Sequence, residues 1–261
     1  MRVAVVNDDG IHAPGLHALA AALGTAGHRL TVVAPHLQRS GSGTSVGSEL
    51  DGHLVAVTAT KLDGLDVRAY AVEGTPTLIA LALAHGLLGR DRPDVVVSGI
   101  NSGHNVGRLT LFSGTLAAAS VAAAYGTPAL ALSCAAKDVD RYGPAATLLS
   151  TTLDDLVAGI PPGVAYNVNY PSRPSTEVRG IRLAHLHSPA RPDVLVERHD
   201  SGMRVVLADR HSDDDATTDI ALLAQGFVTL TPVLAGLREV FDGAVSQETL
   251  DGLWSNAGSA A

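Results

Sequence analysis

The first half of the chain alternates short β-branched apolar runs with Ala- and Leu-rich stretches of helical length. Parallel strands joined by right-handed helical crossovers produce this alternation. Nearly continuous apolar strands are typical of a sheet that is covered on both faces. The expected strands are 2–6, 29–34, 94–97 and 128–132, and the expected helices are 15–26, 76–88, 113–125 and 145–158. We therefore expect an α/β fold with a doubly wound, mostly parallel sheet and helices on both of its faces.

Two segments depart from the strand–helix alternation. Residues 53–61 and 66–72 flank a turn at Asp63–Gly64, which predicts a β-hairpin inserted beside the main sheet. Residues 193–210 alternate around the turn at 199–202, which predicts a long two-stranded arm. Two strands alone are marginally stable, so we expect the arm to pack against its own subunit or a neighbour.

The length of 261 residues fits one domain. Within it we expect a core over 1–160 and a C-terminal part over 161–261, which contains the arm and ends in a helix. The 46% hydrophobic content excludes a disordered chain, and the net charge of −8 argues against a nucleic-acid duplex as partner. A local pocket for a small anion stays compatible with that charge.

The N-terminus has no basic segment leading into a signal-length apolar run. The longest apolar stretches fall short of the roughly 18–20 residues that a membrane span needs, so we expect no membrane association. The single cysteine, Cys134, ends a β-rich run and is expected to be a buried structural thiol. These features favour a cytoplasmic protein.

Two adjacent carboxylates, Asp8 and Asp9, follow the first strand in the sequence NDDG. Ligands of open α/β sheets bind beyond the carboxyl ends of strands, near the point where the direction of winding reverses. A divalent cation relieves the repulsion between two acids at such a place. The alternative is a solvated turn in which both acids accept backbone N–H bonds.

Three further polar segments occupy comparable positions, at 39–44 after the second strand, at 98–107 after the third and at 113–115 where a helix begins. Glycines and hydroxyl side chains in such loops can surround a phosphate, and a helix N-terminus is an anion site. Taken singly, the segment 39–44 also fits a flexible polar loop, 98–107 an Asx-rich turn and 113–115 an ordinary N-cap. Their convergence at neighbouring strand ends favours a site, and hard oxygen ligands favour Mg²⁺ or Mn²⁺ over structural Zn²⁺.

Motifs for other chemistries are missing from the sequence. It contains no C-x-x-C and no Walker or dinucleotide glycine motif after the first strand. A metal-activated water is therefore the simplest nucleophile. His12 lies close enough in sequence to the acids to assist proton transfer, although a His in such a turn is more often structural.

Three motifs, NDDGIHAPGL (7–16), APHLQRSGSG (34–43) and SGINSGHNVG (98–107), resemble those of the SurE family. EGTP (73–76), SGTLAAA (113–119), NVNYP (167–171) and GFVTLTPV (226–233) extend the resemblance in order along about nine-tenths of the chain. The family consists of metal-dependent phosphatases that act as 5′/3′-nucleotidases. The resemblance implies a Rossmann-like core and an extended arm that builds homodimers or homotetramers.

The resemblance also implies the substrate, cofactor and site residues. The substrate is a small phosphorylated compound, chiefly a nucleoside monophosphate, and the cofactor is one divalent metal ion, Mg²⁺ or Mn²⁺, per subunit. The implied metal ligands are Asp8, Asp9, Ser40 and Asn101, and the implied catalytic residues are Asp8, Asp9 and Asn101. The implied phosphate-binding residues are Asn7, Ser40, Gly41, Asn105, Ser113, Gly114 and Thr115.

Several positions depart from the family pattern. Family members commonly carry an acidic pair and a Tyr before SGT, where this chain has Arg108, Leu109 and Phe112, and they continue GTP with Ala-Asp-Cys, where it has Thr77–Leu78. None of these is an implied metal ligand. The first change places a cation near the mouth of the site, which keeps open a phosphatase for another phosphorylated metabolite. A non-catalytic phosphate-ester binder and a scaffold protein built around the arm are the remaining alternatives.

Overall fold

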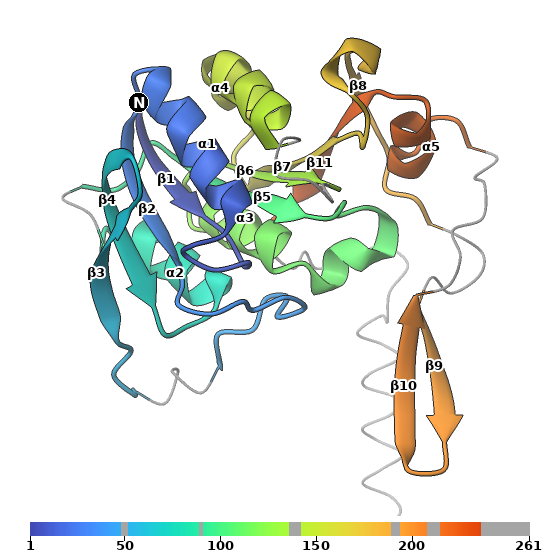
Figure 1. Cartoon of the computed structure of the whole chain (residues 1–261), viewed down its shortest axis with the longest axis horizontal. Helices are drawn as coiled ribbons and strands as arrows, with labels where there is room; N and C mark the ends of the chain where they lie inside the picture. The colour runs from blue at the N-terminus through green and yellow to red at the C-terminus, as the bar shows by residue number, and fades with distance from the viewer. Residues whose placement is uncertain (48–51, 89–90, 136–141, 189–193, 208–214, 236–261) are drawn as a thin grey trace, which may run out of the picture.

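The computed structural model describes residues 1–47, 52–88, 91–135, 142–188, 194–207 and 215–235. A nine-stranded sheet forms its centre, in the order β3-β4-β2-β1-β5-β6-β7-β11-β8, with a separate two-stranded sheet, β9–β10 (Figure 1). The parallel block comprises β1 (Arg2–Val6), β2 (Arg29–Pro35), β4 (Leu65–Val72), β5 (Val95–Ser102), β6 (Ala129–Cys134) and β7 (Val164–Tyr170). On one side the sheet adds β3 (Val57–Leu62), antiparallel to β4. On the other side it adds β11 (Val228–Leu234), antiparallel to β7, and β8 (Ile181–Leu183), parallel to β11.

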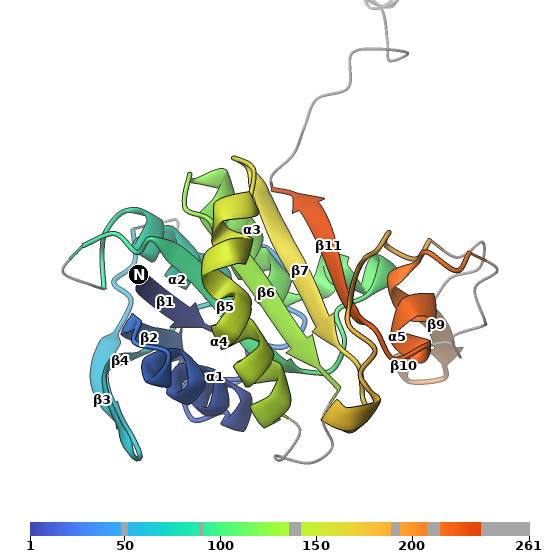
Figure 2. The same ribbon diagram turned by 90° about the horizontal axis from the view of Figure 1, so that it is seen from above.

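Helices cover both faces of this sheet, as Figures 1 and 2 show. One face carries α1 (Pro14–Thr25) and α4 (Tyr142–Gly159), and the other carries α2 (Pro76–Ala84) and α3 (Gly114–Ala124). Successive residues of β1 enter two different cores, because strand side chains alternate between faces. Val3 and Val5 belong to the first core, and Ala4 and Val6 to the second. The predicted doubly wound α/β sheet is therefore confirmed.

The predicted hairpin insertion is corrected by the structure. Its strands β3 and β4 lie in the main sheet, where β4 pairs in parallel with β2 through Val32 and Ala69 and through Ala34 and Ala71. The hairpin covers the polar edge that β2 would otherwise expose, and its apolar residues complete the core. The helix predicted over 76–88 ends earlier, at Ala84, where Gly86 adopts a φ of +75°.

The predicted arm is present as β9 (Val194–His199) and β10 (Gly202–Leu207). It extends away from the main sheet in Figure 1. The helix α5 (Asp219–Ala224) and the 3₁₀ segments η2 (Gly107–Phe112) and η4 (Ser175–Glu177) complete the described elements. The helix expected at the C-terminus falls within 236–261, outside the described residues.

Two expectations about single features can be compared with the structure. Cys134 is fully buried, as predicted. No helix in the described part of the chain has the length and apolar character needed to cross a bilayer.

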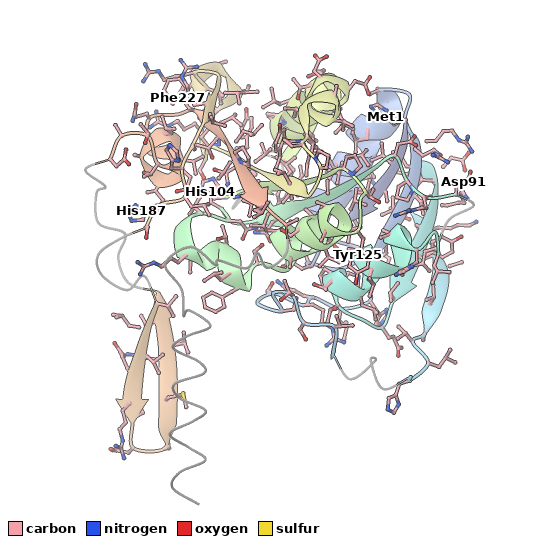
Figure 3. The ribbon with its side chains drawn as sticks, turned by 180° about the vertical axis from the view of Figure 1, so that it is seen from behind. Met1, Asp91, His104, Tyr125, His187 and Phe227 are labelled. Atoms are coloured by element: carbon pink, nitrogen blue, oxygen red, sulfur yellow. The ribbon has the colours of Figure 1, made fainter. Side chains whose placement is uncertain are left out.

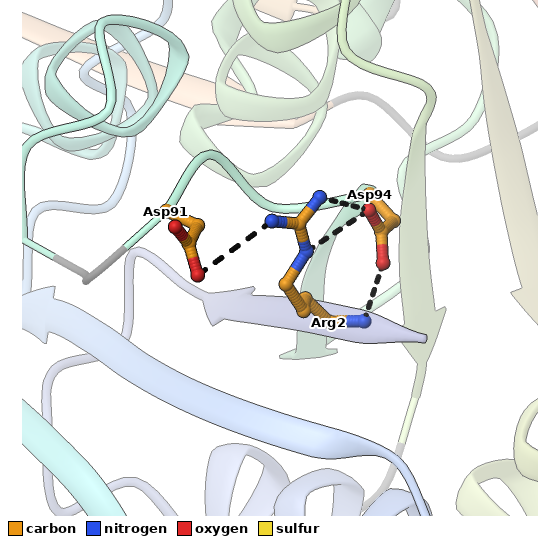
Figure 4. Close-up of polar contacts among 3 residues, drawn as sticks. All are labelled: Arg2, Asp91 and Asp94. Atoms are coloured by element: carbon orange, nitrogen blue, oxygen red, sulfur yellow. Dashed lines mark hydrogen bonds and ion pairs between the residues drawn. The ribbon is translucent and has the colours of Figure 1, made fainter.

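The amino end of β1 is held by an ion pair (Figure 4). Arg2 donates from Nη2 and Nε to Asp94 Oδ1 at 2.5 and 3.1 Å, and its backbone N donates to Asp94 Oδ2 at 2.7 Å. A second acid, Asp91, lies 3.7 Å from Arg2 Nη1. The hydrogen bonds from Arg2 lower the pKa of Asp94 to about 2. This contact joins β1 to the start of β5, its neighbour in the sheet.

The Asp94→Asn variant is expected to lose about 0.5–1 kcal/mol of unfolding free energy at pH 7, because the pair is partly exposed and screened. The folded-state pKa of about 2 lies below the ordinary value of 3.8. The stabilisation is therefore complete above the ordinary value and is lost as the pH falls through the folded value. Chemical denaturation at pH 7 and near pH 2.5 measures the difference from the wild type.

Asp91→Asn is the matched control, and its effect at pH 7 is expected to be smaller because Asp91 lies farther from the guanidinium. An Asp94→Asn deficit of equal size at both pH values would contradict this account of the ion pair.

Candidate functional site

The site begins with the turn that follows β1. Asn7, fully buried, donates from Nδ2 to Gly10 O at 3.0 Å and accepts at Oδ1 from Gly10 N at 3.2 Å. Gly10 has a φ of +105°, a conformation that favours glycine. Ile11 N then donates to Pro35 O, and Arg39 N donates to Asp8 O. The turn is thereby joined to the loop after β2, as expected for adjacent strand ends.

Asp8 meets the first turn of α3. Thr115 Oγ1 donates to Asp8 Oδ1 at 2.5 Å, across 107 positions of sequence. A Cβ added to Gly114 would lie 2.9 Å from Asp8 Oδ2, from Asp8 Cβ and from Ser42 Oγ. Ser113 caps the helix, with its Oγ accepting from Leu116 N at 3.0 Å. A helix N-terminus and a buried carboxylate therefore share one point, and only a glycine fits between them.

Burial raises the pKa of both acids. Desolvation raises the pKa of Asp8 to about 6, the Thr115 hydrogen bond opposes this, and the charge of Asp9 raises it further. Desolvation also raises the pKa of Asp9, opposed by the backbone N–H of Ser102. Both shifts disfavour two negative charges at this place, which is the condition that a bound cation relieves.

Asp9 connects the loops after β2 and β5. Gln38 Nε2 lies 3.4 Å from Asp9 Oδ1 and donates to Ser40 Oγ at 2.8 Å. Ser102 N donates to Asp9 Oδ2 at 3.3 Å. Sequence reasoning did not single out Gln38, although it lies within the motif APHLQRSGSG. Its amide holds the hydroxyl of Ser40 beside the acids.

The segment 98–107 was expected to be a polar loop directly after a strand, and this expectation is corrected. Strand β5 continues to Ser102 through a bulge at Gly99–Asn101. A Cβ at Gly99 would lie 2.3 Å from Leu132 O, so glycine is required for pairing with β6. A bulge redirects the side chains that follow it. Asn101 Nδ2 donates to Gly103 O at 2.7 Å, so Oδ1 is the atom of this amide that is available to a cation.

Asn105 is held by residues from β7. Its backbone N donates to Asn169 Oδ1 at 2.9 Å, and its carbonyl accepts from Asn167 Nδ2 at 2.8 Å and Asn169 Nδ2 at 3.0 Å. Its own Nδ2 donates to Ser133 Oγ at 2.9 Å. These bonds assign a structural role to both asparagines of the NVNYP motif, which the sequence alone did not provide.

A second buried support, Asp219 on α5, was not predicted. Its carboxylate accepts from the backbone N–H groups of Gly107 at 2.8 Å, His187 at 2.9 Å and Ile220 at 2.9 Å. Desolvation raises its pKa, and the three N–H groups oppose that shift. Figure 3 labels His187 and also His104. The ring Nε2 of His104 lies 2.8 Å from Tyr170 O. No local sequence pattern distinguishes Asp219, because an Asp before an apolar run is typical of an ordinary helix start.

The residues present fit a hard divalent cation. Among the described residues, no group of three His, Cys, Asp or Glu side chains forms a metal site, so the donors are two carboxylates and neutral oxygens. Ser42 Oγ is buried beside Asp8 and Gly114 with no hydrogen-bond partner in the described structure. Such an orphaned oxygen near a buried carboxylate indicates a place for a further polar group.

Sequence comparison decides the family. The family described as "Survival protein SurE" matches residues 3–191. The chain belongs to the SurE family. This confirms the membership that the motifs indicated, and it places all four implied metal ligands within the matched region.

Named relatives cover nearly the whole chain. The 5′-nucleotidase SurE of Thermosynechococcus vestitus is 35% identical over 242 residues, covering 89% of this chain and 90% of the relative. The protein of the same name from Aeromonas hydrophila is 36% identical over 238 residues, covering 89% and 92%. The crystal structure of the SurE protein from Aquifex aeolicus has a TM-score of 0.78 at 27% identity, covering 96% of this chain and all of that one.

The Gly114→Ala variant is expected to bind Mn²⁺ about 10- to 100-fold more weakly, because its methyl group displaces Asp8. The fold should persist, since Ala is about 1 kcal/mol better than Gly inside a helix. Calorimetric titration with Mn²⁺ measures the affinity, and circular dichroism checks the fold.

Gly143→Ala is the matched control, because a Cβ at this exposed position of α4 meets no atom within 4 Å. Wild-type Mn²⁺ affinity in Gly114→Ala would show that the close approach of α3 to Asp8 does not matter for the metal.

Proposed function

We propose that this SurE-family protein is a divalent-metal-dependent phosphomonoesterase that hydrolyses nucleoside monophosphates, with a metal-activated water as nucleophile. The observation that carries the proposal is the junction of Asp8 with the first turn of α3. A buried carboxylate attracts a cation, and the N–H groups of a helix start attract an anion. A phosphate ester bound to a metal satisfies both. The relatives named 5′-nucleotidase supply the substrate class.

In this proposal Asp8, Asp9, Ser40 and Asn101 hold one Mg²⁺ or Mn²⁺ per subunit. When bound, the metal supplies positive charge that polarises a phosphoryl oxygen and lowers the pKa of a water. Thr115 orients Asp8 through its hydroxyl, and Gln38 orients Ser40.

The phosphate is proposed to lie between the start of α3 and the loop after β2. The N–H groups of Gly114 and Thr115 stabilise charge that develops on its oxygens. Gly41 has a φ of +78° and open space where a Cβ would stand, so its backbone is accessible to an anion. Asn7 and Asn105, whose amides already bond to Gly10 and Ser133, support the surrounding loops.

The arm is proposed to join subunits into a homodimer or homotetramer. Val196 and Val205 are cross-strand partners, so they share one face of the β9–β10 sheet with Met203, and all three are mostly exposed. On the other face, Arg204 Nη2 lies 2.7 Å from Glu197 Oε2. Exposed apolar side chains gathered on one face favour contact with another surface.

The first test removes bound metal with a chelator and measures phosphate release from nucleoside monophosphates and sugar phosphates. Adding Mg²⁺ or Mn²⁺ is expected to restore release from nucleotides. Asp8→Asn is expected to lower the rate by about 100-fold or more, because it removes a charged ligand from the metal.

Asp94→Asn serves as the control, since the same change at the amino end of the strands, away from the site, should leave the rate unaltered. Release confined to other esters would move the substrate assignment. No release from any ester with either metal would contradict the enzyme proposal and favour a phosphate-ester binder.

For the arm, the double variant Val196→Ser/Val205→Ser is expected to shift the protein from an oligomer toward its 26.7 kDa monomer. Replacing both apolar side chains weakens an interface held by buried apolar area. Sedimentation velocity measures the mass. Leu195→Ser, on the other face of the arm, is the control, and an unchanged mass in the double variant would remove the arm from the interface.

A further inference from the structure

Two apolar side chains stand exposed at the rim of the proposed phosphate site. Leu111 is 74% exposed and Phe112 is 54% exposed. They end η2 and directly precede Ser113, the cap of α3. Single exposed apolar residues are common, whereas two adjacent ones beside a polar site form an apolar surface that a ligand can cover.

The backbone beneath these side chains is held on both sides. Gly43 N donates to Phe112 O at 3.2 Å, and Ser113 N donates to Thr110 O at 3.2 Å. Thr110 Oγ1 donates to Gly107 O at 2.6 Å, and Gly107 is itself bound by Asp219. The Phe112 ring therefore projects from a fixed support, so little order has to be gained when a ligand contacts it.

Chain geometry limits how far Phe112 lies from the phosphate. Consecutive Cα atoms are about 3.8 Å apart, so the Cα atoms of Phe112 and Gly114 are separated by at most about 7.6 Å. A Cβ at Gly114 would already lie 2.9 Å from Asp8 Oδ2. The backbone of Phe112 therefore lies within one nucleoside length of the place where the phosphate is proposed to bind, and a ribose separates the phosphate of a nucleotide from its base by such a span.

We propose that Phe112, flanked by Leu111, is a stacking platform for the base of a nucleoside monophosphate. The inference rests on the proposed function for the position of the phosphate. Every nucleobase has a π-face, so such a platform selects for the presence of a base rather than for its identity. It thereby separates nucleotides from sugar phosphates, which offer the same phosphate without a planar ring.

The test compares two ligands that differ only in the base. Phosphonate analogues of adenosine monophosphate and ribose 5-phosphate, whose P–C bond resists hydrolysis, are titrated by calorimetry into the Mn²⁺-loaded protein. The adenosine analogue is expected to bind about 5- to 100-fold more tightly, the range that base–aromatic stacking provides. Phe112→Ala should reduce this ratio to about one by weakening the adenosine analogue alone, and Phe112→Tyr should retain it.

Tyr125→Ala is the matched control, because Tyr125 is 51% exposed at the opposite end of α3. An unchanged ratio in Phe112→Ala would overturn the platform. So would an equal loss of affinity for both analogues, or a change in oligomeric mass that assigns the rim to a subunit interface.

Phosphate release from adenosine monophosphate, measured in parallel, separates the two hypotheses. A Phe112-dependent binding ratio without phosphate release would leave the platform standing and contradict the proposed enzyme activity. Phosphate release with a binding ratio that does not depend on Phe112 would support the enzyme activity and contradict the platform. Binding of neither analogue would overturn the platform.

Discussion

The approach of α3 to Asp8 is the constraint on which the candidate site depends. Gly114 leaves no room for a side chain beside that carboxylate, and Thr115 fixes its orientation by a hydrogen bond. Because α3 also packs against the sheet through its buried alanines, the position of the helix determines the position of the acid. Burial in this junction raises the pKa of Asp8 and makes a neighbouring positive charge favourable.

The second part of the chain supports loops that the first part provides. Asn167 and Asn169 on β7 hold Asn105, and Asp219 on α5 holds Gly107. All of these groups are buried, so each broken hydrogen bond leaves a polar atom without water. The segment from β5 to α3, which carries Asn101, Phe112 and the helix start, is therefore fixed at Asn105 and Gly107 by residues far along the chain.

The two ends of the parallel strands have different chemistry. At the amino end, Arg2 and Asp94 form an exposed pair in which each charge has its counter-charge. At the carboxyl end, Asp8 is buried, Asp9 is half-buried beside it, and the two charges repel each other. Charge is balanced where the fold needs only stability and left unbalanced where a ligand is proposed to bind. This separation lets Asp94→Asn serve as a control for changes at the site.

The sequence by itself determined β1, β2, β5, β6 and the four helices that cover the sheet, because apolar runs and helical stretches are local signals, but it did not indicate β7 or β11. It also indicated that Asp8, Asn101 and Ser113 lie at converging strand ends. It could not show that β4 pairs with β2, or that a bulge extends β5 to Ser102. Strand pairing depends on contacts between segments that are far apart in the sequence. Gln38 and Asp219 were missed for the same reason. Their roles consist of hydrogen bonds to residues up to 112 positions away, and only the tertiary structure brings such partners together.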